Sequence, residues 1–600
     1  MTTGIERTPG WPDISRQIWE TRYRSGGTGA AAERSIEESW RRIARALAAP
    51  ERADRGGWEQ RFYAALEDFR FLPGGRIQAG AGTRRRITLF NCFVMGPIED
   101  SMEGIFEALK EGALTMQQGG GVGYDFSTLR PRGAFARASG TIASGPVSFM
   151  HIWDSMCATL LSTGNRRGAM IGTLRCDHPD IEEFVDAKRD ERALRRFNLS
   201  VLASDAFMRA VADGAEWPLV FPTGEKRSAT GEIVERVWSG SSQPQLCRVH
   251  RRVSARSLWE RIMRAAYDCA EPGVLFIDRV QHANNLRYCE QIGATNPCGE
   301  IPLPAYGACD LGSINLTRFV REPFSGEATV DIEAIAATAA VAVRMLDNVY
   351  EIASFPLPRQ AEVARQSRRI GLGITGLADA LIMLGLRYGS EQSLRLAGEI
   401  MRTICHAAYG ASIELGREKG SFPQFSAGAY ADGEFIDTLP ADIVAAIRRD
   451  GIRNSHLIAI APTGTISLLA GNVSSGLEPV YAFTMLRRIW QPDGTEKEVP
   501  VEDYAHRLFR ERFGADAALP EAFVAAGEIA PEAQLALQAA LQRFVDNAIS
   551  KTINVPAKYS FESFRGVYER AYALGLKGCA AFRPNPITGA VLLPEDDVSQ

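Results

Sequence analysis

The sequence predicts an α/β protein, and three observations support that fold class. Between about residues 71 and 580, short apolar runs alternate with helical stretches and glycine-rich turns, as they do where strands and helices follow one another. Hydrophobic residues make up 45% and charged residues 23% of the 600 residues, which are globular values and argue against disorder. No repeat of fixed period is present. At about 150 residues per domain the length allows roughly four domains, and fewer if one of them is a barrel.

The first 70 residues predict a helical region. Ser35 and Glu38 have the spacing of a capping box, and Pro50 ends the pattern that they open. Apolar residues at helical spacing between these points are Ile36, Trp40, Ile43 and Leu47. The aromatic residues that indicate a second helix are Trp58, Phe62 and Phe69. A break follows at residues 73–75, where the sequence reads Pro-Gly-Gly.

The α/β region contains four elements with clear patterns. Val274 to Ile277 and Leu457 to Ala461 read as buried strands. Asp331 to Val349 and Ala533 to Ile549 read as long, mostly apolar helices. The polar stretch from Thr223 to Gln245 predicts an exposed hairpin or insertion.

Charge and cysteine content exclude several functional classes. Lys and Arg number 68 against 72 Asp and Glu, so no basic field is available for a nucleic-acid polymer or an anionic membrane. Residues 1–13 lack a secretory signal, and the long uncharged stretch 457–477 is too polar for lipid. Ten cysteines without a CxxC pair predict mostly reduced thiols in the cytoplasm.

Glycine-rich segments are the first candidates for ligand binding. Gln118 to Gly123 (QGGGVG) permits close approach of backbone amides to a ligand, although a tight structural turn would have the same sequence. Ala461 to Ser467 (APTGTIS) follows a predicted strand and offers hydroxyls and amides to a phosphate, aided by a helix N-terminus if a helix follows. Gly371, Gly373 and Gly376 spell GxGxxG, but no apolar strand precedes them, which favours a tightly packed helix start over a dinucleotide site.

No metal centre is predicted. The acidic cluster from Asp177 to Glu182, which includes His178, has the composition of a metal site, but acidic residues at a helix start are more common. The seven histidines form no HExxH pattern, and neither a Walker A sequence nor a GxSxG elbow is present.

The segment with the clearest chemical potential is Asn296 to Ile301 (NPCGEI). Pro297 and Gly299 flank Cys298, which predicts a tight loop that projects one thiol between an amide and a carboxylate. Cys309 lies 11 residues further on. A buried cysteine in a Pro/Gly turn is the alternative that the pattern alone leaves open.

NPCGEI followed by this second cysteine closely resembles the catalytic subunit of ribonucleotide reductase. Other segments that match the family in order are 91–94 (NCFV), QGGGVG, 143–150 (ASGPVSFM), 164–170 (GNRRGAM), 369–379, APTGTIS and 546–556 (DNAISKTINVP). The resemblance implies a ten-stranded α/β barrel of two five-stranded parallel halves, with a central finger loop and an N-terminal helical cap. The implied divisions are a helical region 1–70, a catalytic barrel 71–580 and a short tail 581–600 without a cysteine pair.

The resemblance also implies the roles of individual residues. Cys298 matches the thiyl radical that abstracts the ribose 3′ hydrogen, Glu300 the proton acceptor, and Asn296 the amide that orients the sugar. Cys92 and Cys309 match the thiol pair that supplies two electrons and closes a redox-active disulfide. Residues that match the substrate-binding set are Asn91, Gly121, Pro462, Thr463, Gly464, Thr465 and Ile466. The loop that matches the effector and specificity loop consists of Gly164, Asn165, Arg166 and Arg167, for which a solvated basic turn is the alternative.

The class of reductase follows from what is absent as well as from what matches. The sequence has neither the C-terminal glycine motif of the glycyl-radical class nor the tyrosine pair that relays a radical from a metal subunit. It resembles the adenosylcobalamin-dependent class II, which implies adenosylcobalamin as cofactor, ribonucleoside diphosphates as substrates, and a deoxynucleotide or ATP as effector. Expected partners are a second copy in a homodimer and a redox protein or separate C-terminal subunit that supplies the missing tail thiols. A reductase fed by a metal subunit, and a nucleotide-binding regulatory protein that has lost turnover, are the alternatives.

Overall fold

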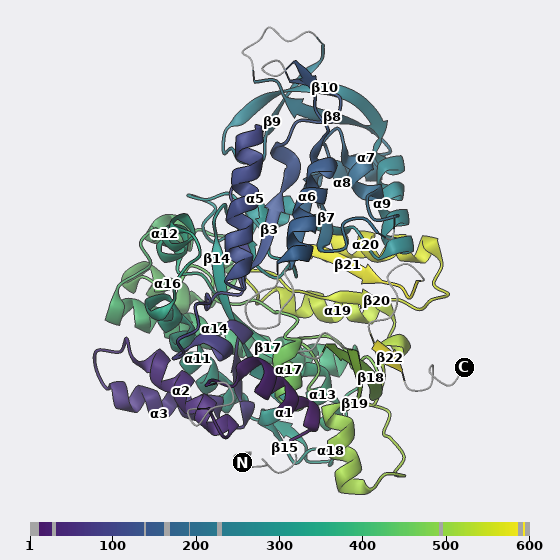
Figure 1. The fold of residues 1–600 in the computed structure, drawn as a ribbon. Helices are drawn as coiled ribbons and strands as arrows, with labels where there is room; N and C mark the ends of the chain where they lie inside the picture. The colour runs from purple at the N-terminus through teal and green to yellow at the C-terminus, as the bar shows by residue number, and fades with distance from the viewer. Residues whose placement is uncertain are drawn as a thin grey trace. The chain divides into compact units, whose positions relative to one another are not determined.

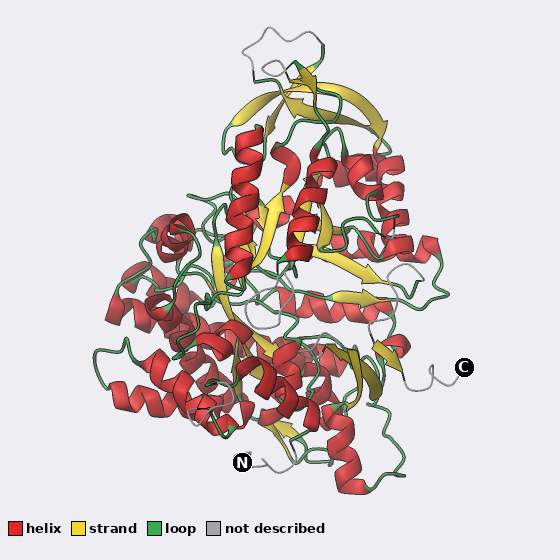
Figure 2. Cartoon of the chain, viewed as in Figure 1, coloured by secondary structure: helices red, strands yellow, loops and turns green. Residues whose placement is uncertain are grey.

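The computed structural model describes residues 11–26, 32–136, 140–160, 169–190, 192–224, 231–490, 496–585 and 592–594. The chain forms two compact units, each assembled from separated segments. The first unit comprises residues 1–91, 309–551 and 590–600, and the second comprises 92–308 and 552–589. Both contain helices and strands (Figure 2), so the predicted α/β class is confirmed.

The described part of the second unit contains a mostly parallel sheet. Its strands, in spatial order, are β2 (Cys92–Val94), β3 (Gly121–Asp125), β6 (Met170–Arg175), β7 (Phe197–Ala203), β11 (Gly273–Phe276), β21 (Gly578–Phe582) and β20 (Thr552–Asn554). Neighbours from β2 to β11 pair in parallel, β21 pairs antiparallel with β11, and β20 pairs in parallel with β21. Strand β11 confirms the strand predicted at 274–277. Most positions of β3, β6 and β7 are buried, as in parallel sheets covered on both faces.

Helices and smaller strands complete the second unit (Figure 1). The helices are α5 (Met102–Gln117), α6 (Pro146–Thr159), α7 (Ile181–Asp186), α8 (Asp205–Asp213), α9 (Ala255–Cys269), α10 (Ile277–His282) and α20 (Phe561–Ala573). Strands β8 (Glu216–Pro222), β9 (Ile233–Val237) and β10 (Pro244–Ser254) form a separate antiparallel sheet. The paired β9 and β10 confirm the hairpin predicted for the polar stretch.

The first unit contains three strands that pair with one another. Strand β1 (Phe71–Pro73) pairs antiparallel with β14 (Ala308–Asn315), and β14 pairs in parallel with β17 (Ile370–Thr375). Leu372 forms a parallel bridge with Ile458, and Ile460 forms one with Ile549. The strand predicted at 457–461 is therefore present only as bridges. Smaller sheets pair β15 (Val320–Arg321) with β16 (Thr329–Val330), and β18 (Thr484–Trp490) with β19 (Glu496–Glu502) and β22 (Leu592–Pro594).

The N-terminal helices form where they were predicted, with two corrections. The first two long helices are α2 (Ile36–Ala48) and α3 (Arg55–Leu66). Ser35 is the N-cap of α2, but its side chain makes no capping hydrogen bond, and Glu38 accepts from the backbone of Arg34 instead. The predicted capping box is therefore wrong. Helix α3 ends before Phe69, because Asp68 and Phe69 adopt positive φ angles of 55° and 57°.

The remaining helices of the first unit cover its strands. They are α1 (Asp13–Ile18), α4 (Gly75–Gly80), α11 (Ile332–Ile352), α12 (Pro358–Ser367), α13 (Leu377–Met383), α14 (Glu391–Lys419), α15 (Ala427–Ala431), α16 (Ala441–Asp450), α17 (Thr465–Leu469), α18 (Tyr504–Phe513) and α19 (Pro531–Gln542). Helix α11 confirms the helix predicted at 331–349, and Asp331 caps it through the amide of Ala334 at 3.0 Å. No helix in the described part of the chain is long and apolar enough to cross a membrane.

The helix predicted at 533–549 is too long. Helix α19 ends at Gln542, and the following residues run beside the 457–460 segment. The Asp546 carboxylate accepts from the backbone amides of Leu457 and Ile458, both at 2.8 Å, and from the Tyr409 hydroxyl at 2.7 Å. These tertiary hydrogen bonds outweigh the helical periodicity of the sequence.

Candidate active site

A β-hairpin of the second unit presents the NPCGE segment at its tip. Strands β12 (Ala294–Thr295) and β13 (Pro302–Leu303) pair antiparallel on either side of it. At Gly123 in β3 an added Cβ would lie 1.8 Å from the Thr295 carbonyl oxygen, so only glycine admits the hairpin backbone so close to the strand. The Asn198 side chain donates to the Pro297 carbonyl at 2.8 Å. Both contacts fix the hairpin to the parallel sheet.

Three of the predicted site residues meet beside this hairpin. Asn296 Nδ2 donates to Cys92 Sγ at 3.1 Å, and Cys92 Sγ lies 3.9 Å from Glu300 Oε1. All three side chains are buried. Asn296 Oδ1 accepts from the Ile301 amide at 2.9 Å, which fixes the orientation of its side chain. The structure thus brings a thiol, an amide and a carboxylate into contact.

Cys298 differs from these neighbours because it is exposed. The turn that presents it is closed by a hydrogen bond from the Gly299 amide to the Asn296 carbonyl at 3.0 Å, and Gly299 has a φ of +87°. A residue with a side chain would be strained there. The alternative of a buried cysteine in a structural turn does not describe this thiol, which is open to a reactant.

Cys309 belongs to the first unit, where it lies in β14 and is fully buried. Its thiol donates to the Asp310 carbonyl oxygen at 3.3 Å. Because side chains alternate along a strand, Cys309 and Asp310 point to opposite faces of β14. The Asp310 carboxyl oxygens have no hydrogen-bond partner from another residue in the described part of the chain. Burial, reinforced by the charge of Asp347, raises the pKa of Asp310 well above its usual value.

The APTGTIS loop also lies in the first unit. Residues 462–465 are half-buried, so the loop remains accessible. Thr463 and Gly464 adopt positive φ angles of 46° and 40°. Thr463 Oγ1 hydrogen bonds with Thr375 Oγ1 at 2.9 Å and accepts from the Gly476 amide at 3.1 Å. A helix follows the loop, but α17 spans only five residues, and we assign its N-terminus no role in binding an anion.

The GxGxxG segment forms strand β17 and the start of α13. A Cβ at Gly373 would lie 2.2 Å from the Ala459 carbonyl oxygen, and Gly376 caps α13 with a φ of +73°. The glycines therefore serve close packing, as the sequence interpretation favoured. Sequence reasoning overlooked Thr375, which ends β17 and contacts Thr463. Its place at the carboxyl end of a parallel strand was the available signal.

The acidic cluster at 177–182 marks the start of a helix, as predicted. Asp177 pairs with Arg175 at 2.8 Å, and α7 begins directly after Asp180. His178 is buried, with its Nε2 at 3.0 Å from the Leu129 carbonyl, and burial lowers its pKa to about 4. Within the described ranges, no group of three or more His, Cys, Asp or Glu side chains is arranged to hold a metal ion.

The other predicted residues are distributed as follows. Gly121 begins β3 and pairs in register with Cys92. Asn91 ends the first segment of the first unit, and its Oδ1 is buried with no hydrogen-bond partner among the described residues. The predicted effector loop 164–167 lies outside the described residues.

A fold of two α/β units with buried parallel strands, and a hairpin that carries one exposed thiol and brings an amide and a carboxylate to a second, buried thiol, are what we expect of an enzyme of thiol redox chemistry. Residues 90–582 match the family model of the ribonucleotide reductase barrel domain, and residues 12–86 match that of its all-alpha domain. The chain belongs to the ribonucleotide reductase family, as a catalytic chain that reduces ribonucleotides to the deoxyribonucleotides needed for DNA.

Three relatives that are between 28% and 38% identical to this chain have names that agree with this assignment. The chain is 38% identical to the vitamin B12-dependent ribonucleoside-diphosphate reductase of Mycobacterium tuberculosis strain CDC 1551, with 94% of this chain and 78% of the relative covered. It is 34% identical to the protein of the same name from Thermoplasma acidophilum, with 90% and 66% covered. It is 28% identical to the vitamin B12-dependent ribonucleotide reductase of Streptomyces coelicolor, with 88% and 60% covered.

Proposed function

We propose that this chain is an adenosylcobalamin-dependent reductase that converts ribonucleoside diphosphates into 2′-deoxyribonucleoside diphosphates. The observation that carries the proposal is the exposed Cys298 thiol at the tip of a hairpin whose flanking residues, Asn296 and Glu300, contact Cys92. The printed names of the relatives at 34–38% identity support the cofactor and the diphosphate substrate.

The site residues have complementary roles in this proposal. Cys298, as a thiyl radical, takes the 3′ hydrogen of the ribose and returns it at the end of the reaction. Glu300 accepts the proton of the 3′ hydroxyl, and Asn296 orients the sugar. Cys92 and Cys309 lose two hydrogens and become a disulfide, while the 2′ hydroxyl leaves as water. One ribonucleotide and two thiols thus yield one deoxyribonucleotide, one water and one disulfide.

The side chains of the site are compatible with a radical source that is supplied by a bound cofactor. Cys298 is exposed, and the described residues build no cluster of side chains that could hold a metal ion. Adenosylcobalamin, when bound, supplies the radical that oxidises the Cys298 thiol. The contribution of the chain itself is to present this sulfur on a rigid turn and to keep Glu300 and Cys92 in the buried contact beside it.

We further propose that the sugar and phosphates lie against Asn91, Gly121 and the substrate loop, which we define as residues 462–466. The unpartnered Asn91 Oδ1 and the accessible hydroxyl-rich loop support this assignment. Residues 164–167 are proposed to sense the deoxynucleotide or ATP effector. The two units are proposed to form one ten-stranded barrel at 71–580, with the 294–303 hairpin as its finger loop, the region 1–70 as a helical cap and 581–600 as a tail.

The proposal includes partners and a compartment. A homodimer is supported by α5, whose exposed Met102, Phe106 and Leu114 lie at spacings of four and eight residues and so share one face. A redox protein or a separate C-terminal subunit is proposed to reduce the disulfide again. The reducing cytoplasm is the proposed location, because the cysteines of the site must stay in the thiol state before each turnover.

Purified protein with adenosylcobalamin, CDP and dithiothreitol should form dCDP, and Cys298→Ala should lower turnover by about 10³-fold or more because no other thiol can take the 3′ hydrogen. Cys289→Ala is the matched control, since Cys289 is also an exposed cysteine of the second unit. Turnover that persists in Cys298→Ala would defeat the proposal. Turnover without cobalamin would favour a separate metal subunit, and nucleotide binding without turnover would favour a regulatory protein. Thioredoxin in place of dithiothreitol should not sustain cycling.

A further inference from the structure

Two buried aspartates of the first unit contact one another at the N-terminus of α18. Asp379 lies in the first turn of α13, and Asp503 is the N-cap of α18. Asp379 Oδ1 accepts from the Ala505 amide at 3.0 Å, and Asp503 Oδ1 accepts from the His506 amide at 3.1 Å. The two carboxyl groups interact electrostatically, and both are almost fully removed from solvent.

Close contact between two buried carboxyl groups favours the protonation of one of them. An ionised carboxylate has no donor, so two carboxyl groups can hydrogen bond only if one is protonated. Two buried negative charges in contact would also repel strongly. Burial raises the pKa of both groups, and hydrogen bonds from backbone amides oppose the rise at each of them. Both oxygens of Asp379 accept from backbone amides, whereas Oδ1 of Asp503 accepts from the His506 amide, so the hydrogen bonds favour Asp379 as the carboxylate and Asp503 as the acid.

The carboxylate of Asp379 is hydrogen bonded to the segment that follows α17. Asp379 Oδ2 accepts from the Ser474 amide at 2.5 Å, and the Asp379 amide donates to Ser474 Oγ at 3.2 Å. The Ser474 carbonyl in turn accepts from Thr375 Oγ1 at 2.9 Å and from the Gly376 amide at 2.7 Å. Thr375 Oγ1 also hydrogen bonds with Thr463 of the substrate loop at 2.9 Å. An unbroken set of contacts thus joins the aspartate pair to the loop.

Thr463 is the residue of the substrate loop that these contacts hold in place. Its φ of +46° is unfavourable for a residue with a branched side chain, so the loop keeps this shape only if its surroundings hold it. The two groups that hold the Thr463 hydroxyl are Thr375 and the Gly476 amide, and both lie next to Ser474 in space or in sequence.

We propose that Asp379 and Asp503 are positioning residues for the substrate: through Ser474 and Thr375 they hold residues 462–466 in the conformation that binds the nucleotide phosphates. This inference rests on the proposed function only for the assignment of the loop to the substrate. Neither aspartate touches substrate. The pair sets the affinity for the nucleotide and leaves the radical steps at Cys298 unchanged.

The test is steady-state kinetics with CDP, adenosylcobalamin and dithiothreitol. Asp379→Asn replaces an acceptor oxygen by an amide NH2, which cannot accept from the Ser474 and Ala505 amides at once. KM for CDP should rise at least tenfold, while kcat stays within threefold. Asp503→Asn keeps a donor for Asp379 and should raise KM by less than threefold. Asp437→Asn, the same exchange at an exposed site of this unit, controls for the substitution itself.

Other outcomes overturn the inference. An unchanged KM in Asp379→Asn would do so, as would a fall in kcat at constant KM. If Asp379→Asn fails to fold, Thr375→Val serves instead, because it removes only the hydroxyl between Ser474 and Thr463. This variant should raise KM at least fivefold. An unchanged KM would contradict the proposed connection between Ser474 and Thr463. Equilibrium dialysis of CDP separates the two proposals. Wild-type protein that binds CDP without reducing it refutes the proposed function, and the inference is then decided by whether Asp379→Asn weakens binding tenfold.

Discussion

Asp310 follows Cys309 in β14 and is a buried acid that the proposed chemistry does not use. The charged groups that face it are Asp347, which raises its pKa, and Arg368, which lowers it. Tyr350 also lies near both Cys309 and Asp310, and burial raises the pKa of this phenol as well. Burial is the largest effect on Asp310, so folding favours the neutral form of its carboxyl.

The raised pKa of Asp310 predicts a dependence of stability on pH. The folded chain binds this proton more tightly than the unfolded chain, so the stabilisation is complete below the ordinary pKa of 3.8 and is lost as pH rises toward the raised value. Each pH unit of that window removes about 1.4 kcal/mol. Asp310→Asn cannot ionise, and its Tm should fall less than that of the wild type between pH 5 and pH 8 in thermal melts. Parallel Tm profiles for the two proteins would contradict this account.

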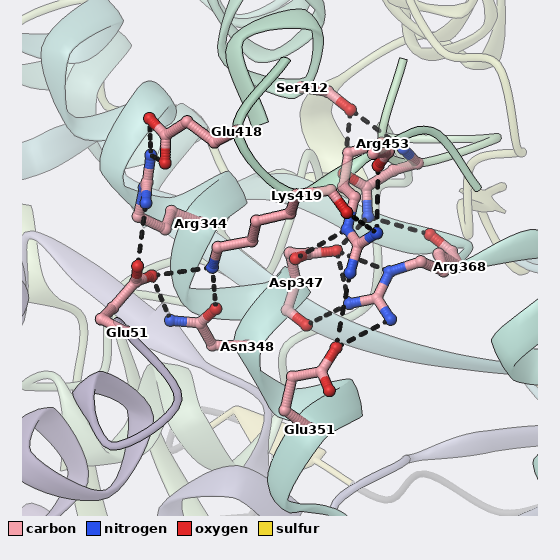
Figure 3. Close-up of polar contacts among 12 residues, drawn as sticks. Glu51, Arg344, Asp347, Asn348, Glu351, Arg368, Ser412, Glu418, Lys419 and Arg453 are labelled. Carbon is pink, nitrogen blue, oxygen red and sulfur yellow. Dashed lines mark hydrogen bonds and ion pairs between the residues drawn. The ribbon is translucent and has the colours of Figure 1, made fainter. Parts of the chain in front are cut away.

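At the scale of elements, α11 and α14 are joined to the N-terminal helices by buried charges (Figure 3). Glu51, which follows α2, accepts from Asn348 at 2.7 Å and pairs with Arg344 at 3.0 Å and with Lys419 at 2.9 Å. A second group lies further along α11. Its members are Asp347, Glu351, Arg368, Ser412, Arg453 and Asn454.

Removing one charged partner from a buried network lowers the free energy of unfolding by more than the whole network contributes to it. The reason is that the opposite charges stay buried without their partner. Glu51→Gln should therefore reduce the free energy of unfolding by about 3 kcal/mol at pH 7. Although burial opposes ionisation of Glu51, the hydrogen bonds from Asn348 and Lys419 lower its pKa below the ordinary 4.5. Its contribution is thus present above pH 4.5 and is lost as pH falls through the lowered pKa. Denaturant unfolding at pH 7 and pH 4 measures both effects.

Glu414→Gln is the matched control for this network. Glu414 lies on α14, as Lys419 does, and pairs with Arg417 at the surface. Exposed pairs contribute little, so the loss should be about 0.5 kcal/mol or less. Equal losses of unfolding free energy in Glu51→Gln and Glu414→Gln would show that the buried Glu51 network stabilises the fold no more than an exposed ion pair does.

At the scale of the whole molecule, the proposed homodimer places an exposed apolar face of α5 against a second copy. Met102 and Phe106 are 59% and 47% exposed, which is unusual for large apolar side chains at adjacent turns of one helix. Phe106→Glu puts a charge on this face and should convert the dimer into a monomer in analytical ultracentrifugation. Val237→Glu, at an exposed apolar residue of β9, should leave the dimer intact. A dimer that survives Phe106→Glu would place the interface elsewhere.

Sequence patterns predicted elements well where local rules act alone. The helix at 331–349 has an acidic N-cap and a continuous apolar run, and α11 follows both. The prediction failed at residues 543–549, where the side chain of Asp546 accepts from amides almost 90 residues away. The prediction was also wrong at Ser35. This residue is the N-cap of α2, as predicted, but its hydroxyl makes no capping hydrogen bond. Periodicity reports local preference, and distant hydrogen bonds are outside its reach.

The sequence by itself indicated the proposed chemistry of this protein, because NPCGEI with its following cysteine carries the residue types that the proposed reaction uses, in order, in one short stretch. Only the tertiary structure decided which of the site residues contact one another. Cys92 meets Asn296 and Glu300 across 204 and 208 residues of chain. Asp379 and Asp503 meet at the N-terminus of α18 only because folding buries both carboxyl groups in one place. Burial and contact between distant segments create these properties, and no local pattern encodes them.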